Sequence, residues 1–217
     1  MSSQKRDYKQ FAEGECYHVF NRGNAKMKIF LNDDDYTFFL FRLKEYLFPE
    51  RRRAPSAGST DERYSRVALP EGAFTLIAYC LMPNHFHLQI RQNGETSISS
   101  LILRLCGSYA KYFNKKYDRV GSLYQDQFKA VLIDSDNQMA ALSAYIHQNP
   151  KVAGLVLRTE EWTFSSYPEY LGIRKGILVE SDPILAEFDN REEYRSFVEG
   201  QFAGISERKE IENLIVD

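Results

Sequence analysis

Apolar and polar residues alternate along several short segments of the chain, and this period of two predicts β-strands. We expect strands over residues 16–22, 73–81, 85–91 and 128–134. Only Met82, Pro83 and Asn84 separate the second strand from the third, and such a short turn predicts an antiparallel hairpin.

Three other segments predict helices. In two of them apolar residues recur at helical spacing, and the third begins with Ser135, Asp136 and Asn137, which are typical of a helix start. We expect helices over residues 32–48, 97–117 and 135–149. Asn32, Ser97 and Ser135 begin these segments, and their side chains are typical of helix N-caps. The third helix is expected to stop at Asn149, because a residue before proline disfavours the α conformation.

The order strand, helix, strand, strand, helix, strand, helix predicts an α+β fold, with a ferredoxin-like or RRM-like antiparallel sheet and helices packed on one face. The other face is then free to receive a ligand. We expect one main domain over residues 1–170, which contains a mobile basic loop at about 50–71. Residues 171–217 are predicted to form a small, acidic, mostly helical C-terminal extension.

The composition, 43% hydrophobic and 14% aromatic over 217 residues, is typical of a folded globular protein. No apolar stretch approaches the roughly 20 residues of a membrane helix, and the N-terminus lacks the apolar core of a secretory signal. We therefore expect a cytoplasmic protein with no membrane association. The net charge is −2, but from residue 180 onward the chain carries 11 acidic and 4 basic residues. The main part is thus net basic, which is compatible with phosphate binding.

The three cysteines, Cys16, Cys80 and Cys106, are odd in number, far apart and set among apolar neighbours. This pattern favours buried free thiols over disulfides or a zinc site.

The sequence His85-Phe86-His87 lies within a predicted strand, so alternation sends both imidazoles to one face and Phe86 to the other. Two histidines spaced in this way can bind one divalent metal ion. A bare pair of this kind is, however, more often exposed or hydrogen-bonded than metal-bound. The spacing alone leaves both readings open.

Four segments add context to this pair. They are YHVFNRGNAKMKIF at 17–30, LMPNHFHLQI at 81–90, SYAKYFNKKYDRVGSLYQDQFKAVLID at 108–134 and AYIHQNPKVAGLV at 144–156. Together, in this order, they resemble the single-tyrosine HUH transposases, including the transposase-like proteins associated with repetitive extragenic palindromes (REP). The resemblance spans roughly residues 16–170. It departs at Asp126-Gln127, where relatives commonly have a small and a basic residue, which puts a phosphate contact there in doubt.

The resemblance implies that Tyr145, on a helix before an Asn-Pro pair, is the catalytic nucleophile. It also implies that His85, His87 and Asn149 bind a divalent metal ion, Mg²⁺ or Mn²⁺, with Gln148 as the fallback for the amide ligand. In an unfamiliar sequence Tyr145 would be read as a partly buried tyrosine that finishes a helix.

The implied reaction is transposase chemistry on single-stranded, hairpin or palindromic DNA, with a covalent 5′-phosphotyrosine, a free 3′-hydroxyl and rejoining without ATP. The family also implies a homodimer. Basic residues in or near the matching segments are the predicted DNA contacts: Arg22, Arg104, Lys111, Lys115, Lys116, Arg119 and Lys129. Among their aromatic neighbours Tyr109, Tyr112 and Phe113, at least two are expected in the core, and His147 is expected to pack or hydrogen-bond rather than bind metal.

Two other hypotheses stay open. A domesticated protein could bind DNA or RNA hairpins without transposing. A metal-dependent hydrolase with a water nucleophile would keep its activity in Tyr145→Phe, whereas the tyrosine mechanism predicts its loss.

Overall fold

The structure is a computed structural model that describes residues 10–49 and 68–201. Most of the predicted basic loop, and the end of the acidic extension from residue 202, lie outside these residues. In the described part, no helix combines the length and apolar character needed to cross a membrane.

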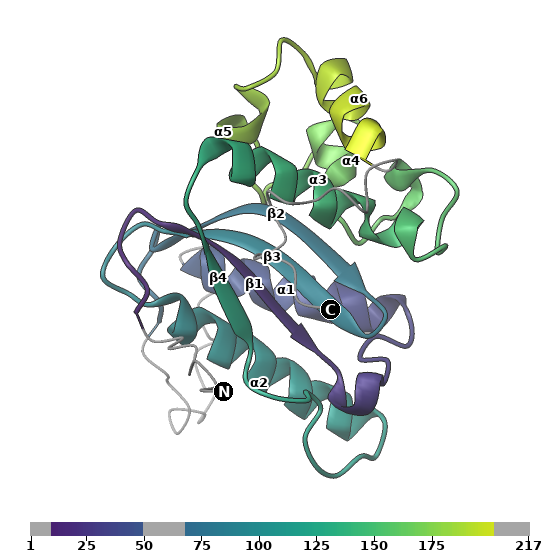
Figure 1. Cartoon of the computed structure of the whole chain (residues 1–217). Coiled ribbons are helices and arrows are strands. Elements are labelled where there is room, and N and C mark those ends of the chain that lie inside the picture. The colour runs from purple at the N-terminus through teal and green to yellow at the C-terminus, as the bar shows by residue number, and fades with distance from the viewer. Residues whose placement is uncertain (1–9, 50–67, 202–217) are drawn as a thin grey trace, which may run out of the picture.

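Four strands form one antiparallel sheet in the order β2-β3-β1-β4 (Figure 1). They are β1 (Cys16–Arg22), β2 (Phe74–Met82), β3 (His85–Gln92) and β4 (Lys129–Ile133). The first and third strands in sequence are central, and the other two form the edges, which is the ferredoxin-like arrangement. The predicted antiparallel α+β fold is confirmed.

Two long helices, α1 (Asp33–Leu47) and α2 (Ile98–Lys116), pack on one face of the sheet as expected. Asn32 caps α1 through a reciprocal capping box with Asp35, and the Ser97 hydroxyl accepts a hydrogen bond from the first turn of α2. The core beneath them includes Val19, Phe86 and Leu88 from the two central strands. These apolar side chains therefore set which face of β1 and β3 is buried.

The remaining helices pack on the opposite face, so the expected placement of all helices on one face applies only to α1 and α2. They are α3 (Asp136–Val152), α4 (Tyr167–Tyr170), α5 (Asp182–Leu185) and α6 (Arg191–Gln201), which lie together at the top of Figure 1. A β-bulge between Leu76 and Ala78 in β2 shifts its register against β3, and Ile77, Cys80 and Met82 pack with α3. Because β2 has apolar residues on both faces, it binds helices on both.

Helix α3 continues through Pro150 to Val152, so the prediction that it stops at Asn149 was wrong. Proline has no N–H to donate to the carbonyl four residues earlier, but in the last turn this costs a single hydrogen bond. The amide of Ala153 bonds the Asn149 carbonyl, and Gly154, at φ +69°, ends the helix in the left-handed region.

Residues after α3 cover the edge of the sheet at β2. The Leu81 amide donates to the Phe164 carbonyl at 2.9 Å, and the Ser166 amide donates to the Tyr79 carbonyl at 3.0 Å. Tyr170 then donates its hydroxyl to the Ile77 carbonyl at 2.9 Å. The edge strand is thereby protected from pairing with another chain, and the packing runs continuously across the predicted boundary at residue 170.

The cysteines are free, with Cys16 and Cys80 buried and Cys106 partly buried, as expected.

His147 lies in a buried polar contact that joins α3 to α6. Its Nδ1 is 2.8 Å from the Tyr194 hydroxyl, and its Nε2 is 2.8 Å from the Ser166 hydroxyl. The prediction that His147 is hydrogen-bonded is confirmed. Burial lowers the pKa of His147 to about 3, so the ring stays neutral at physiological pH.

This burial predicts a pH-dependent stability. In the unfolded chain His147 gains a proton as the pH falls below about 6.5, whereas the folded protein excludes that proton until about pH 3. Between pH 7.5 and 5 His147 should therefore lower the free energy of unfolding by about 2 kcal/mol. Urea denaturation at both pH values measures this change in the free energy of unfolding. The change should be smaller in His147→Gln than in the wild type, by about 2 kcal/mol. An equal pH dependence in both proteins would contradict this account.

Candidate active site

His85 and His87 project from β3 on the face opposite α1 and α2, because Phe86 and Leu88 take the buried face. Their ring centroids are 4.8 Å apart. The Nδ1 of His85 is 2.6 Å from Oδ1 of Asn84. Since an amide oxygen only accepts, Nδ1 of His85 carries a proton and donates it to Asn84.

His87 is 5% exposed, and its Nδ1 lies 2.9 Å from Nε2 of His18. Its Nε2 is buried and has no hydrogen-bond partner among the described residues. Burial, followed by the effects of His85 and His18, holds the pKa of His87 well below its usual value. A neutral imidazole with a free nitrogen is the form that binds a metal ion.

His18 was missed by the sequence reasoning. It lies on the neighbouring strand β1, is fully buried, and faces the same side as the histidines of β3. The alternation of side chains along the first strand indicates that His18 lies on the face opposite Val19. Its proximity to His87 depends on the order of strands in the sheet, however, and no local pattern reveals that order.

Tyr145 on α3 lies against these rings. Its ring is nearly perpendicular to that of His87, with centroids 5.6 Å apart, and to that of His18, with centroids 6.4 Å apart. The tyrosine is 7% exposed. The structure thus brings together the predicted nucleophile and the predicted metal-binding pair from segments about 60 residues apart.

The two candidates for the amide ligand, Asn149 and Gln148, have different hydrogen-bond partners. The Nδ2 of Asn149 donates to the carbonyl of Tyr145, one helical turn earlier, at 2.8 Å, and this bond holds the amide close to the tyrosine. The Nε2 of Gln148 donates to the Val198 carbonyl on α6. Gln148 is therefore engaged in helix packing.

No group of three or more His, Cys, Asp or Glu side chains within residues 10–49 and 68–201 could hold a metal ion.

A cleft of about 190 Å³ opens beside the histidines. It is lined by Phe20, Asn21, Arg22, Asn84, His85, His87, Gln125, Asp126, Gln127 and Lys129. Two of the predicted DNA contacts, Arg22 and Lys129, are among these residues. The Lys129 ammonium is 5.8 Å from the ring centroid of Phe20. Asp126 also lines the cleft, so one carboxylate offsets part of its positive charge.

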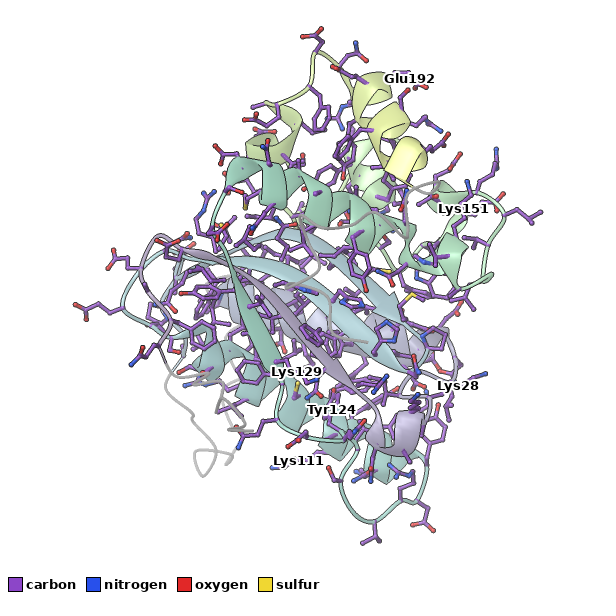
Figure 2. The ribbon with its side chains drawn as sticks, in the orientation of Figure 1. Lys28, Lys111, Tyr124, Lys129, Lys151 and Glu192 are labelled. Atoms are coloured by element: carbon purple, nitrogen blue, oxygen red, sulfur yellow. The ribbon has the colours of Figure 1, made fainter. Side chains whose placement is uncertain are left out.

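The other predicted DNA contacts lie elsewhere. Arg104, Lys111, Lys115 and Lys116 belong to α2, which packs on the face of the sheet opposite the histidines. Figure 2 shows Lys111 on α2 at the lower edge of the molecule and Lys129 on β4. Arg119 follows α2 and donates to the Asn114 side chain at 3.2 Å. The predicted cations therefore form two groups, of which one borders the histidine cleft.

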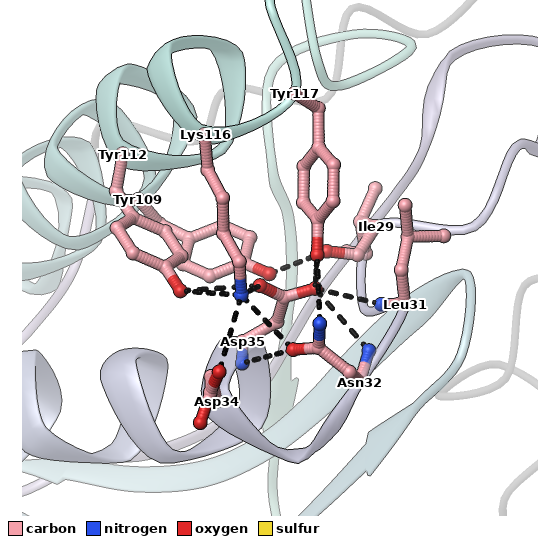
Figure 3. Close-up of polar contacts among 9 residues, drawn as sticks. All are labelled: Ile29, Leu31, Asn32, Asp34, Asp35, Tyr109, Tyr112, Lys116 and Tyr117. Atoms are coloured by element: carbon pink, nitrogen blue, oxygen red, sulfur yellow. Dashed lines mark hydrogen bonds and ion pairs between the residues drawn. The ribbon is translucent and has the colours of Figure 1, made fainter.

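Lys116 is committed to a structural contact with α1 (Figure 3). Its ammonium is 2.8 Å from Oδ1 of Asp35, a fully buried carboxylate. The hydroxyl of Tyr117 donates to Oδ2 of Asp35 at 2.7 Å, and the Leu31 amide donates to the same oxygen at 2.8 Å. The ammonium of Lys116, at the surface, is thus paired with a buried carboxylate. Tyr109 and Phe113 of the same helix are fully buried, as expected for at least two of the three aromatic residues.

Residues 47–149 match the model of the IS200-like transposase family. The chain is 27% identical over 106 residues to a Haemophilus influenzae protein named as a REP-associated tyrosine transposase. That alignment covers 43% of this chain and 59% of the relative, so it spans less than two thirds of the relative's length.

The fold resembles a solved structure described as a REP-associated tyrosine transposase bound to a REP hairpin, with a TM-score of 0.55 and 15% sequence identity. The match covers 83% of this chain and 94% of that one. Over residues 47–149 this chain is similar to the IS200-like transposases, and the expected resemblance is confirmed.

The Asp35 cluster predicts a second effect on stability. Burial alone would raise the pKa of Asp35, but hydrogen bonds from Lys116, the Leu31 amide and Tyr117 outweigh it, and the pKa lies below its usual value. The stabilisation is complete above the unfolded-state pKa near 4 and is lost as the pH falls through the lower folded-state value.

Asp35→Asn should reduce the free energy of unfolding at pH 7 by about 2–3 kcal/mol, measured by urea denaturation. Its loss of stability below pH 4 should also be smaller than that of the wild type. Lys115→Ala, on an exposed neighbour, is the matched control and should change stability by less than about 0.5 kcal/mol. Equal stability of Asp35→Asn and the wild type would rule out this role for the cluster.

Proposed function

We propose that this chain is a metal-dependent transesterase that recognises single-stranded DNA with hairpin or palindromic ends, nicks it through Tyr145 and rejoins the strands. The observation that carries the proposal is the edge-on contact of Tyr145 with His87, whose buried Nε2 has no partner among the described residues. The family supports the class of reaction. The hairpin-bound relative supports the class of DNA.

The residues present fit a divalent metal ion. His87 offers a lone pair on its buried Nε2, His85 directs its Nδ1 to Asn84, and Asn149 offers the oxygen of an amide whose Nδ2 already donates to the Tyr145 carbonyl. Two imidazoles and an amide oxygen suit Mn²⁺, with Mg²⁺ as the other candidate. When bound, such an ion polarises an oxygen of the scissile phosphate and stabilises the charge that develops during the displacement.

In the proposed cleavage, the Tyr145 hydroxyl oxygen attacks the phosphorus of the scissile phosphodiester. The bond from phosphorus to the 3′ oxygen breaks, and the phenolic proton is balanced by protonation of that leaving oxygen. The products are a 5′-phosphotyrosine and a free 3′-hydroxyl. Because one phosphoester replaces another, attack by a second 3′-hydroxyl reverses the step, rejoins DNA and releases Tyr145 without ATP.

Arg22 and Lys129 are the proposed phosphate contacts, since both line the cleft beside His85 and His87. The cations of α2 lie on the opposite side of the sheet and are therefore distant from the proposed reaction. A homodimer remains part of the proposal on the family resemblance, and light scattering of the protein with and without DNA would test it.

The test of the nucleophile is the formation of a protein-DNA adduct that resists denaturation. Wild-type protein incubated with end-labelled hairpin DNA and Mn²⁺ should form the adduct, and Tyr145→Phe should form none. Tyr124→Phe is the control. It also removes one tyrosine hydroxyl, but from a residue buried in the core beneath α1 and α2, and this variant should still form the adduct.

Tight binding without an adduct across a pooled hairpin library would favour a domesticated hairpin-binding protein instead. Cleavage that persists in Tyr145→Phe would favour a water nucleophile and a hydrolase.

The assignment of the cleft predicts a salt-dependent difference between the two groups of cations. Each phosphate contact contributes about 0.7 to the slope of log K against log salt for single-stranded DNA. Arg22→Ala and Lys129→Ala should each reduce that slope by about 0.7–0.9, whereas Lys111→Ala should leave it unchanged. Fluorescence anisotropy of a labelled hairpin over a series of NaCl concentrations measures the slopes. A loss in Lys111→Ala alone would instead place the DNA on α2.

A further inference from the structure

We propose that His18 is a positioning residue for the metal site, which holds His87 in the tautomer that presents Nε2 to the ion. This inference rests on the proposed function, because it concerns the same site. His18 touches neither metal nor DNA in this account and acts through its hydrogen bond to His87.

The geometry places His18 in a position to fix the ring of His87. In the pairing of β1 with β3, Phe20 lies opposite His87, and His18 is its diagonal neighbour on the same face. The two imidazoles are nearly parallel, with an angle of 20° between planes and centroids 5.1 Å apart. The distance from Nε2 of His18 to Nδ1 of His87 is 2.9 Å. His18 has no exposed surface, so bulk water does not compete for this bond.

A hydrogen bond between two ring nitrogens needs one donor and one acceptor. If Nδ1 of His87 carries the proton and donates, Nε2 of His87 keeps its lone pair. His18 then accepts on Nε2, and its own proton resides on Nδ1. In the opposite tautomer His87 would carry a buried proton on Nε2, where no described residue accepts it. The unpartnered nitrogen thus favours the tautomer that can bind a metal ion.

The second histidine of the pair is fixed in the same way by a different residue. Asn84 presents Oδ1 to Nδ1 of His85 at 2.6 Å, and its Nδ2 donates to the Lys26 carbonyl at 3.4 Å, which sets the orientation of the amide. Both histidines therefore use Nδ1 for an orienting hydrogen bond. Metal-binding histidines usually have such a partner, which fixes the ring and raises its basicity.

His18 also contacts the other parts of the site. Its ring stacks on Phe20 with centroids 4.8 Å apart and meets the edge of Tyr145 at 6.4 Å. The buried ring of His18 thus contacts Phe20, which lines the cleft, as well as His87 and Tyr145.

The first experiment is nitrogen-15 NMR of the histidine rings in the metal-free protein, which reports the tautomer without any reaction. Wild-type His87 should carry its proton on Nδ1. His18→Gln supplies an amide oxygen near the position of the ring Nε2 and should retain that tautomer, whereas His18→Leu should lose it. A proton on Nε2 of His87 in the wild type would overturn the inference even if the leucine variant failed to fold.

The second experiment is titration with Mn²⁺, followed by electron paramagnetic resonance of the free ion. His18→Leu should bind Mn²⁺ about 10- to 100-fold more weakly than the wild type, and His18→Gln should recover most of that loss. Lys115→Ala is the control, because α2 packs on the face of the sheet opposite the histidines, and this variant should leave the affinity unchanged. Equal Mn²⁺ affinity in the wild type and His18→Leu would contradict the inference.

The two proposals fail separately. Protein that binds Mn²⁺ with the expected dependence on His18 but forms no DNA adduct would reject the proposed reaction and leave the role of His18 intact. Adduct formation together with an unchanged Mn²⁺ affinity in His18→Leu would support the proposed reaction and reject the role of His18. A wild-type protein that binds no Mn²⁺ would overturn both.

Discussion

The alternation of side chains along β1 and β3 is the constraint on which the candidate site depends. Val19, Phe86 and Leu88 must pack against α1 and α2, and each anchors one face of its strand. His18, His85 and His87 are thereby forced onto the opposite face. A slip of one residue in either strand would bury imidazoles in the apolar core and expose the apolar side chains to solvent. The same packing energy that stabilises the fold therefore holds the histidines in register.

The position of Tyr145 depends on the helices that pack on the face of the sheet opposite α1 and α2. The bulge in β2 and its apolar residues on both faces give α3 a surface to pack on, and α3 carries the tyrosine to His87. The far side of α3 is held by the buried hydrogen bonds of His147 and by Tyr194 on α6. The C-terminal helices thus contribute to the geometry of the site although they supply none of its proposed ligands.

Much of this could be predicted from local pattern. Strand periodicity placed His85 and His87 on one face, and the helix that carries Tyr145 and Asn149 was found from its cap residues and from the proline that follows Asn149. What could not be predicted depends on contacts between distant segments. The proximity of His18 requires the strand order, the separation of the α2 lysines from the cleft requires the layer order, and the ion pair of Lys116 requires Asp35, 81 residues away.

The central claim is that His85, His87 and Asn149 converge on one metal ion beside Tyr145. Anomalous diffraction from crystals soaked in Mn²⁺ tests it most directly. We expect an anomalous peak in contact with Nε2 of both histidines and Oδ1 of Asn149. A manganese ion bound through Nδ1 of either histidine, or at another position with no peak between these residues, would contradict it.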